Sequence, residues 1–160
     1  MVRKMSKIND IQKKGLRNVA RRISQKKNVS VLFSSREVAY TDGYNIFLSS
    51  SSINNLKIAQ GLLSHEAGHI GYGSFDRKIS RLRNFLVRKY GISEKTAHGL
   101  INAVEDCRID LINSRIFPGF YKNLKNYIAK DILPSLVERR NLIVDINLYL
   151  IGGFKRWEEF

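Results

Sequence analysis

Cysteine is nearly absent from this chain, since Cys107 is the only one among 160 residues. One thiol excludes an internal disulfide framework and any zinc site built from several cysteines. The chain also lacks a long hydrophobic stretch, because no apolar run approaches the roughly 20 residues that span a bilayer. The basic N-terminal residues continue into polar sequence without the apolar stretch of a secretory signal. We therefore expect an intracellular, cytoplasmic protein with no transmembrane segment.

Acidic residues are scarce in two segments, although the whole chain has 14. Residues 1–30 carry ten Lys/Arg and only one acid, Asp10, while residues 77–89 carry six Lys/Arg and no acid. Most of the positive net charge of +14 therefore lies in these two segments. We interpret each first as the solvated face of a helix. Binding of nucleic acid, an anionic membrane or an acidic partner stays open for each, because clustered positive charge attracts polyanions.

Hydrophobic periodicity in the first part of the chain predicts one helix followed by a small sheet. Residues 6–26 have the apolar spacing of an amphipathic helix, and residues 29–33 alternate as a strand does. Asp42-Gly43 lies between two further strand-like runs and is typical of the tight turn of a hairpin, because both residues tolerate positive φ. We expect a small, mostly antiparallel sheet here.

The rest of the chain is predicted to be helical. Further helices are expected over residues 55–70, 76–89 and 93–114, and then two or three more, with boundaries near Pro134 and Asn141. The basic helix is expected to turn Ile79, Leu82 and Leu86 inward. This order of elements is typical of an α+β fold. We expect a single domain over residues 1–160, in which residues 1–74 hold the sheet and 75–160 form a helical part.

His65-Glu66-Ala67-Gly68-His69 is the most informative segment for function. Residues four apart on a helix lie on one face, so His65 and His69 can reach one metal ion, and imidazole nitrogen suits Zn²⁺. Glu66 lies off that axis, where it can accept a proton from a water molecule at the metal. Histidine is rare in this chain, with three residues. Because charged groups on a buried helix are costly unless paired, a zinc ion is a better interpretation than two structural histidines.

A catalytic zinc ion needs a third protein ligand and an open position. The metzincin pattern would need glycine and histidine where this chain has Tyr72 and Phe75, so that pattern is absent. We select Glu105, because helical spacing places it beside the apolar stripe of its helix. Asp106 and His98 stay open as alternative ligands.

Several neighbours of Glu105 have candidate supporting roles. Asp106 and Asp110, with Asn102, are candidates to hydrogen-bond the outer nitrogens of the histidine ligands. His98 lies two turns before Glu105 and is a candidate catalytic residue that stabilises an oxyanion on the scissile carbonyl. Tyr72 and Tyr121 are weaker candidates for that role.

The HEAGH segment, together with Asn102-Ala-Val-Glu105-Asp106-Cys-Arg108-Ile, resembles the gluzincin metallopeptidases. The likeness extends to the compact minigluzincins and to peptidase-like domains associated with CobT-type and von Willebrand A-type proteins. It covers roughly residues 30–120. The resemblance implies a zincin-like fold whose edge strand, such as 44–48, binds extended peptide by strand addition. It also implies an aspartate four residues after the glutamate ligand, but that position here is Ile109.

These observations predict a zinc metalloendopeptidase that binds one Zn²⁺ and cleaves a peptide or protein substrate. Small relatives of this kind can be latent, with a terminal segment such as residues 6–26 or the aromatic tail 153–160 in the cleft. One alternative is a nucleic-acid-binding protein with a structural or vestigial zinc site. Another is an inactive zincin-like scaffold that positions a partner.

Overall fold

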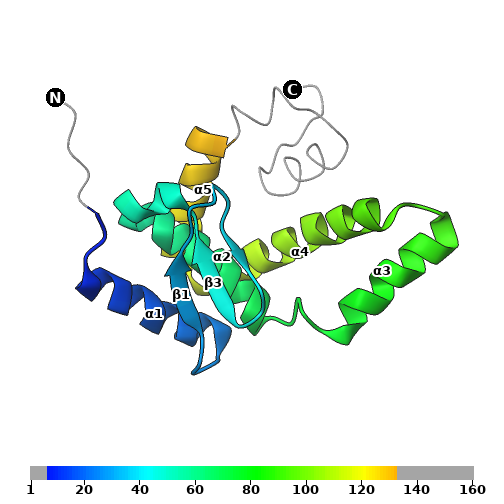
Figure 1. Cartoon of the computed structure of the whole chain (residues 1–160), viewed down its shortest axis with the longest axis horizontal. Coiled ribbons are helices and arrows are strands. Elements are labelled where there is room, and N and C mark those ends of the chain that lie inside the picture. Colours follow the sequence, from blue (N-terminus) through cyan, green and yellow to red (C-terminus); the bar gives the residue numbers. More distant parts are fainter. Residues whose placement is uncertain (1–6, 133–160) are drawn as a thin grey trace.

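A computed structural model describes residues 7–132 of the chain. Within that range the fold is α+β, as predicted (Figure 1). The chain runs in order through α1 (Asp10–Ser24), β1 (Ser30–Phe33), β2 (Tyr40–Thr41), β3 (Asn45–Leu48), the 3₁₀ helix η1 (Ser50–Asn54), α2 (Leu56–Gly71), α3 (Arg77–Tyr90), α4 (Glu94–Ile116), α5 (Pro118–Tyr127) and the short π-helix η2 (Ile128–Ile132). The boundaries expected near Pro134 and Asn141, and the tail 153–160, lie outside the described residues.

The sheet has the strand order β1-β3-β2. The hairpin expected at Asp42-Gly43 is present: β2 pairs antiparallel with β3, and Gly43 has a φ of 91°. However, β1 pairs parallel with β3, so the expectation of a mostly antiparallel sheet was wrong. The expectation that residues 44–48 form an edge strand was also wrong, because β3 is the central strand. Parallel pairing needs the crossover from β1 to β3, a non-local feature that alternation within each strand does not reveal.

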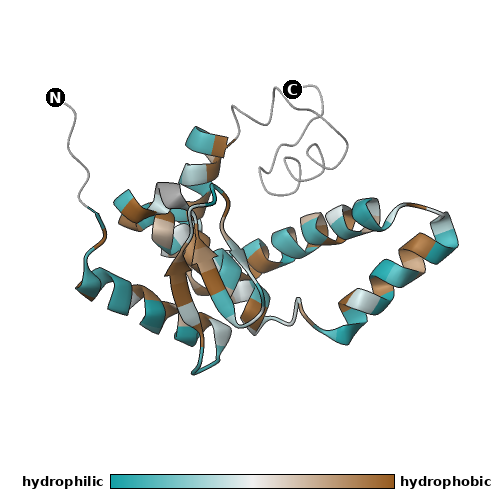
Figure 2. Cartoon of the chain, in the orientation of Figure 1, coloured by the Kyte–Doolittle hydropathy of each residue, from teal (hydrophilic) through white to brown (hydrophobic). Residues whose placement is uncertain are grey.

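Helix α2 is the centre of the fold, since α1, α4, α5 and the sheet all pack against it. The hydrophobic core lies along these contacts. Strands β1 and β3 are largely hydrophobic (Figure 2). Two glycines permit the close approach of neighbouring helices. A Cβ at Gly61 would lie 2.6 Å from the backbone nitrogen of Leu124 on α5, and a Cβ at Gly68 would lie 2.5 Å from Cγ2 of Ile109 on α4. The site residues on α2 are thus held by packing on several sides.

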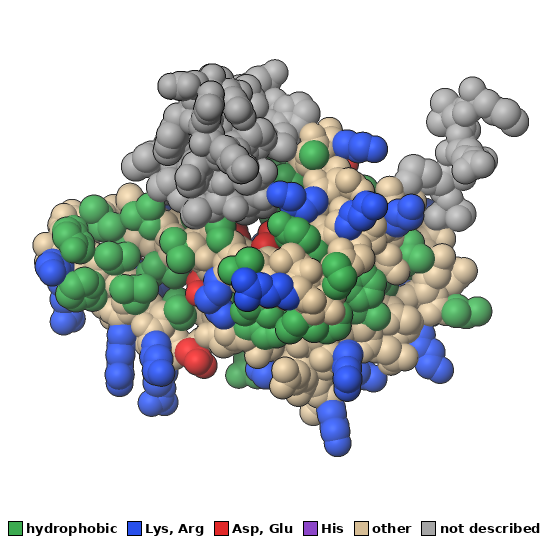
Figure 3. Space-filling view, turned by 180° about the vertical axis from the view of Figure 1, so that it is seen from behind, with side chains coloured by type: hydrophobic (Ala, Val, Ile, Leu, Met, Phe, Trp, Pro, Cys, Tyr) green, Lys and Arg blue, Asp and Glu red, His purple; other side chains and the backbone are tan. Residues whose placement is uncertain are grey.

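Helices α3 and α4 form an antiparallel pair that extends away from the body (Figure 1). No residue of α3 is buried, and Leu82 is 46% exposed, so the expected inward stripe is only partly formed by Ile79 and Leu86. From behind, hydrophobic side chains gather on the surface of this pair (Figure 3).

None of the helices in the described range is long and apolar enough to cross a membrane.

Candidate metal centre

Helix α2 presents His65 and His69 one turn apart on the side that meets α4. Asn55 caps the start of the helix, because its side chain accepts hydrogen bonds from the backbone N–H groups of Lys57 and Ile58. Both histidines are half-buried. The tight packing of Gly68 against α4 brings the carboxylates of α4 to the two imidazole rings.

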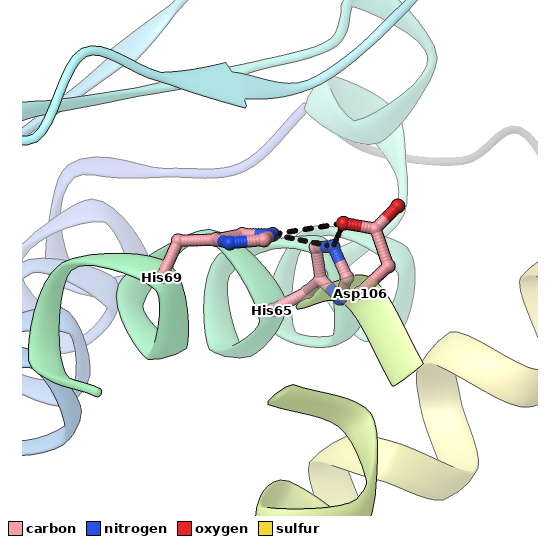
Figure 4. A group of neighbouring side chains, drawn as sticks. All are labelled: His65, His69 and Asp106. Atoms are coloured by element: carbon pink, nitrogen blue, oxygen red, sulfur yellow. Dashed lines mark hydrogen bonds and ion pairs between the residues drawn. The ribbon is translucent and has the colours of Figure 1, made fainter. Parts of the chain in front are cut away.

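Three potential ligand atoms converge between the two helices (Figure 4). The Nε2 atoms of His65 and His69 lie 3.1 Å apart. Oδ1 of Asp106 lies 3.2 Å from Nε2 of His69 and 3.6 Å from Nε2 of His65. In a tetrahedral zinc site with bonds of about 2.0–2.1 Å, neighbouring ligand atoms lie about 3.3–3.4 Å apart. The three separations therefore match the size of a zinc site with three protein ligands.

The outer nitrogen of each imidazole has its own hydrogen-bond partner. Nδ1 of His65 lies 2.8 Å from Oδ1 of Asp110. Nδ1 of His69 lies 3.0 Å from Oγ of Ser74, whose hydroxyl donates to Glu105 at 2.7 Å. An ionised carboxylate only accepts, and the Ser74 hydroxyl proton is already committed to Glu105, so both Nδ1 atoms carry the ring proton.

This hydrogen bonding leaves the two Nε2 atoms with lone pairs that face each other. Two lone pairs at 3.1 Å repel unless a cation or a shared proton lies between them. Two imidazole nitrogens and a carboxylate oxygen are a donor set that suits Zn²⁺. The residues present therefore fit a zinc ion.

The charges around this cluster favour a positive species between the rings. Burial lowers the pKa of His65, but the hydrogen bonds to Asp106 and Asp110 outweigh burial and raise that pKa well above its usual value. Burial raises the pKa of Asp106, yet the hydrogen bonds from His65 and His69 hold it well below its usual range. Oδ2 of Asp110 is buried without a hydrogen bond to any described residue. In the absence of metal, these shifts favour protonation of His65.

Glu66 lies on α2 next to His65, and it lines a cleft that opens over the cluster. Its side chain is 7% exposed and makes no hydrogen bond to the described residues. Burial raises the pKa of Glu66, although the nearby His65 and His69 act in the opposite direction. A buried carboxylate with a raised pKa and no fixed partner is suited to act as a general base.

Glu105 is buried as expected, but the structure does not bring it to the imidazole nitrogens of the cluster. Its carboxylate receives two hydrogen bonds from Arg108, at 2.8 and 2.7 Å, and one from Ser74. The Arg108 hydrogen bond holds the pKa of Glu105 below its usual value. Asp106, the alternative ligand, takes the position beside the two Nε2 atoms. Asp110 lies four residues after Asp106 on the same helix.

No protein-family model, curated protein or solved structure matches this chain.

A cleft of about 640 Å³ opens over the cluster. One wall is formed by residues 37–41, which include the short outer strand β2, and the others by side chains of α2, α4, α5 and η2. His98 is exposed and lines this cleft, with Nε2 3.4 Å from the Asn102 amide. Among the described residues, none of 7–26 lines the cleft. The option that α1 fills the cleft in a latent form therefore finds no support in its packing.

Three further residues complete the comparison with the sequence-based expectations. Tyr72 donates to Asn113 and lines a different cleft, and Tyr121 does not line the cleft over the cluster. Ser74 was not predicted as a site residue. Its only sequence signal is its place in the turn after α2, five residues beyond His69, and such a position does not reveal which side chains a hydroxyl reaches.

Proposed function

We propose that this chain is a zinc-dependent metallopeptidase in which His65, His69 and Asp106 hold one zinc ion. The observation that carries the proposal is the set of three ligand atoms at zinc-site separations, next to a buried glutamate. A bound zinc ion supplies a Lewis acid that polarises a carbonyl and lowers the pKa of water.

The protein groups around the cluster have complementary roles in hydrolysis. Glu66 accepts a proton from the attacking water and then donates it to the leaving amine, for which its raised pKa is favourable. Asp110 and Ser74 hold the two imidazole rings with Nε2 turned toward the metal. His98 lines the cleft, where its ring can donate a hydrogen bond to the oxygen of the scissile carbonyl.

The walls of the cleft favour a peptide as the substrate. Strand β2 is one of the two outer strands of the sheet, and it lines the cleft together with residues 37–39. An extended peptide can add to such an edge through backbone hydrogen bonds, with its alternate side chains in the cleft. Leu62, Phe75 and Tyr127 supply an apolar lining for those side chains. These features support peptide-bond hydrolysis in a zincin-like fold.

The test compares zinc-loaded wild type with Glu66→Gln on an unfolded, fluorescently labelled protein substrate. The variant should bind zinc as tightly as wild type, while its cleavage rate falls by about 100-fold or more, because a positioned base contributes that much. Glu37→Gln is the matched control, since Glu37 also lines the cleft but lies on the strand side. Equal cleavage by wild type and Glu66→Gln would contradict the proposal.

Latency through the C-terminal segment is part of the same proposal. A variant that ends at Ile132 is therefore assayed beside the full chain. Higher activity of the shortened variant supports a latent form, whereas equal activity excludes inhibition by residues 133–160.

A further inference from the structure

A second cleft, of about 820 Å³, lies at the C-terminal end of α1 and has a different chemistry. Four cationic side chains line it, Arg21, Arg22, Lys26 and Lys27, and no carboxylate of residues 7–132 does. Its floor includes Tyr72 and Phe117, which are half-buried aromatic residues. The cleft over the metal cluster, by contrast, is lined by several acidic residues.

The cations of this cleft have no partners of opposite charge among the described residues. None of the four makes an ion pair there, although Lys13 on the same helix pairs with Asp10 at 3.1 Å. Arg21 and Arg22 lie in the last turn of α1, where they also offset the helix dipole. Lys26 and Lys27 lie after the end of the helix, so their positive charge is additional to the charge that offsets the helix dipole. Four like charges around a hollow repel one another, so the cleft favours an anion with several charges.

The positive surface continues along the outer face of α1. Lys14, Arg17 and Arg21 are spaced three and four residues apart and therefore form one stripe on the helix. From Lys14 to Arg21 the stripe extends about 10 Å, the axial length of about three successive phosphates on one nucleic-acid strand. A repeating anion thus matches this surface better than a single phosphate does.

The packing of α1 argues against a membrane as the partner. A helix that binds a bilayer surface inserts an apolar face between the lipids. The apolar face of α1, formed by Leu16, Ala20 and Ile23, is instead buried in the protein core. Apart from Ile11, which is 83% exposed, the surface that α1 leaves for a partner is mainly polar and charged.

Two features favour phosphate groups and bases over an acidic protein. The planar fork of Arg21 and Arg22 matches the geometry of phosphate oxygens. Beside the cleft, the ring of Tyr44 is 73% exposed and has Nζ of Lys26 over it at 5.8 Å. An exposed ring next to a cation is the combination that stacks on a base while holding its phosphate. We propose that this cleft and the outer face of α1 bind the phosphodiester backbone of a nucleic acid.

This second site is close to the metal centre along the chain. Tyr72, which lines the basic cleft, is three residues beyond His69. Nucleic-acid binding itself needs no zinc and no hydrolysis, so it is measured independently of the proposed peptidase activity.

The experiment measures fluorescence anisotropy of labelled single-stranded and duplex DNA of about 20 nucleotides, titrated with the full chain at several salt concentrations. The test variant carries Arg21→Gln, Arg22→Gln, Lys26→Gln and Lys27→Gln. The matched control carries Lys78→Gln, Arg81→Gln, Arg88→Gln and Lys89→Gln on α3. Both variants lose the same net charge at exposed positions, so an effect of overall charge would weaken both equally.

We expect the α1 variant to bind DNA at least about tenfold more weakly. For the duplex, the slope of log K against log salt should become less steep by about 3 to 4. The α3 variant should stay within about threefold of wild type. Tyr44→Ala should weaken single-stranded binding more than duplex binding if bases stack on its ring.

Three results would overturn the inference. The first is an absence of DNA binding by wild type at low salt. The second is an equal loss of affinity in both charge variants. The third is tighter binding to anionic phospholipid vesicles or to polyglutamate than to either DNA, which would assign the surface to a membrane or to an acidic protein.

Discussion

Oδ1 of Asp110 on α4 lies at hydrogen-bond distance, 2.8 Å, from Nδ1 of His65 on α2. The two residues belong to matching pairs: His65 and His69 are one turn apart on α2, and Asp106 and Asp110 are one turn apart on α4. Asp106 lies beside the Nε2 atoms of the two histidines, and Asp110 binds Nδ1 of His65. This pairing of two helical turns is the basis of the candidate metal centre.

Asp110→Asn tests the role of that hydrogen bond. In the metal-free protein the pKa of His65 should fall, because Asp110 contributes to raising it. Zinc affinity should fall by about 10- to 100-fold, as expected when a partner of a ligand histidine is lost. An NMR pH titration and a zinc competition titration measure the two effects. Asp131→Asn, at an exposed position, is the control and should change neither quantity.

The raised pKa of His65 predicts that the metal-free protein loses stability as pH rises and that stabilisation by added zinc grows over the same range. A raised folded-state pKa stabilises the fold fully below the unfolded value of about 6.5, and that stabilisation is lost as pH rises through the folded-state pKa. The melting temperature of the metal-free protein should therefore fall as pH rises above about 6.5. The increase in melting temperature on adding zinc should grow over the same range, because zinc displaces a proton.

Calorimetry in two buffers of different ionisation enthalpy counts the released protons. Net proton release on zinc binding near pH 7 is the expected result. Binding without any proton release would contradict a raised pKa for His65.

Ser74→Ala should loosen His69. The substitution removes the hydroxyl that accepts from Nδ1 of His69 and donates to Glu105. We expect zinc affinity to fall by about tenfold, with Glu105 still paired to Arg108. Ser114→Ala is the control, because within the described part of the chain the Ser114 hydroxyl bonds only to a carbonyl of its own helix. A zinc titration in which both variants match wild type would exclude this role for Ser74.

Gly68→Ala should separate α2 from α4. The new Cβ would lie 2.5 Å from Cγ2 of Ile109, a clash that should cost about 1–3 kcal/mol of unfolding free energy. Because α4 carries Asp106, zinc affinity should fall as well. Gly15→Ala is the same substitution in a helix where the new Cβ meets no atom of the described residues within 4 Å, and it should stabilise the protein by about 0.5–1 kcal/mol. Urea denaturation measures both changes.

Local patterns in the sequence predicted most helices within a few residues of their observed ends. Helix α2 was expected over 55–70 and is Leu56–Gly71, and the hairpin at Asp42-Gly43 was expected from its turn residues between two strand-like runs. Those features depend on caps, turns and periodicity, which are local. The parallel pairing of β1 with β3 depends on residues far apart in the chain, so local patterns did not reveal it.

The carboxylate that lies beside the two histidines was harder to predict, because Glu105 and Asp106 are neighbours on one helix. Our choice of Glu105 assumed that Val104 faces the core, yet Val104 is 59% exposed. Helix α4 instead packs on α2 with a face that contains Asp110 and Asn113, and part of its apolar stripe faces outward. A helix that buries polar residues at a site defeats assignment by apolar periodicity.

The most direct test of the central claim is a zinc competition titration of wild type, Asp106→Asn and Glu105→Gln. Both variants neutralise one carboxylate on α4 with little change in shape. The account predicts stoichiometric zinc on wild type, a loss of about 100-fold or more in affinity for Asp106→Asn, and a loss within about tenfold for Glu105→Gln. Wild type that binds no zinc, or a larger loss in Glu105→Gln than in Asp106→Asn, would contradict it.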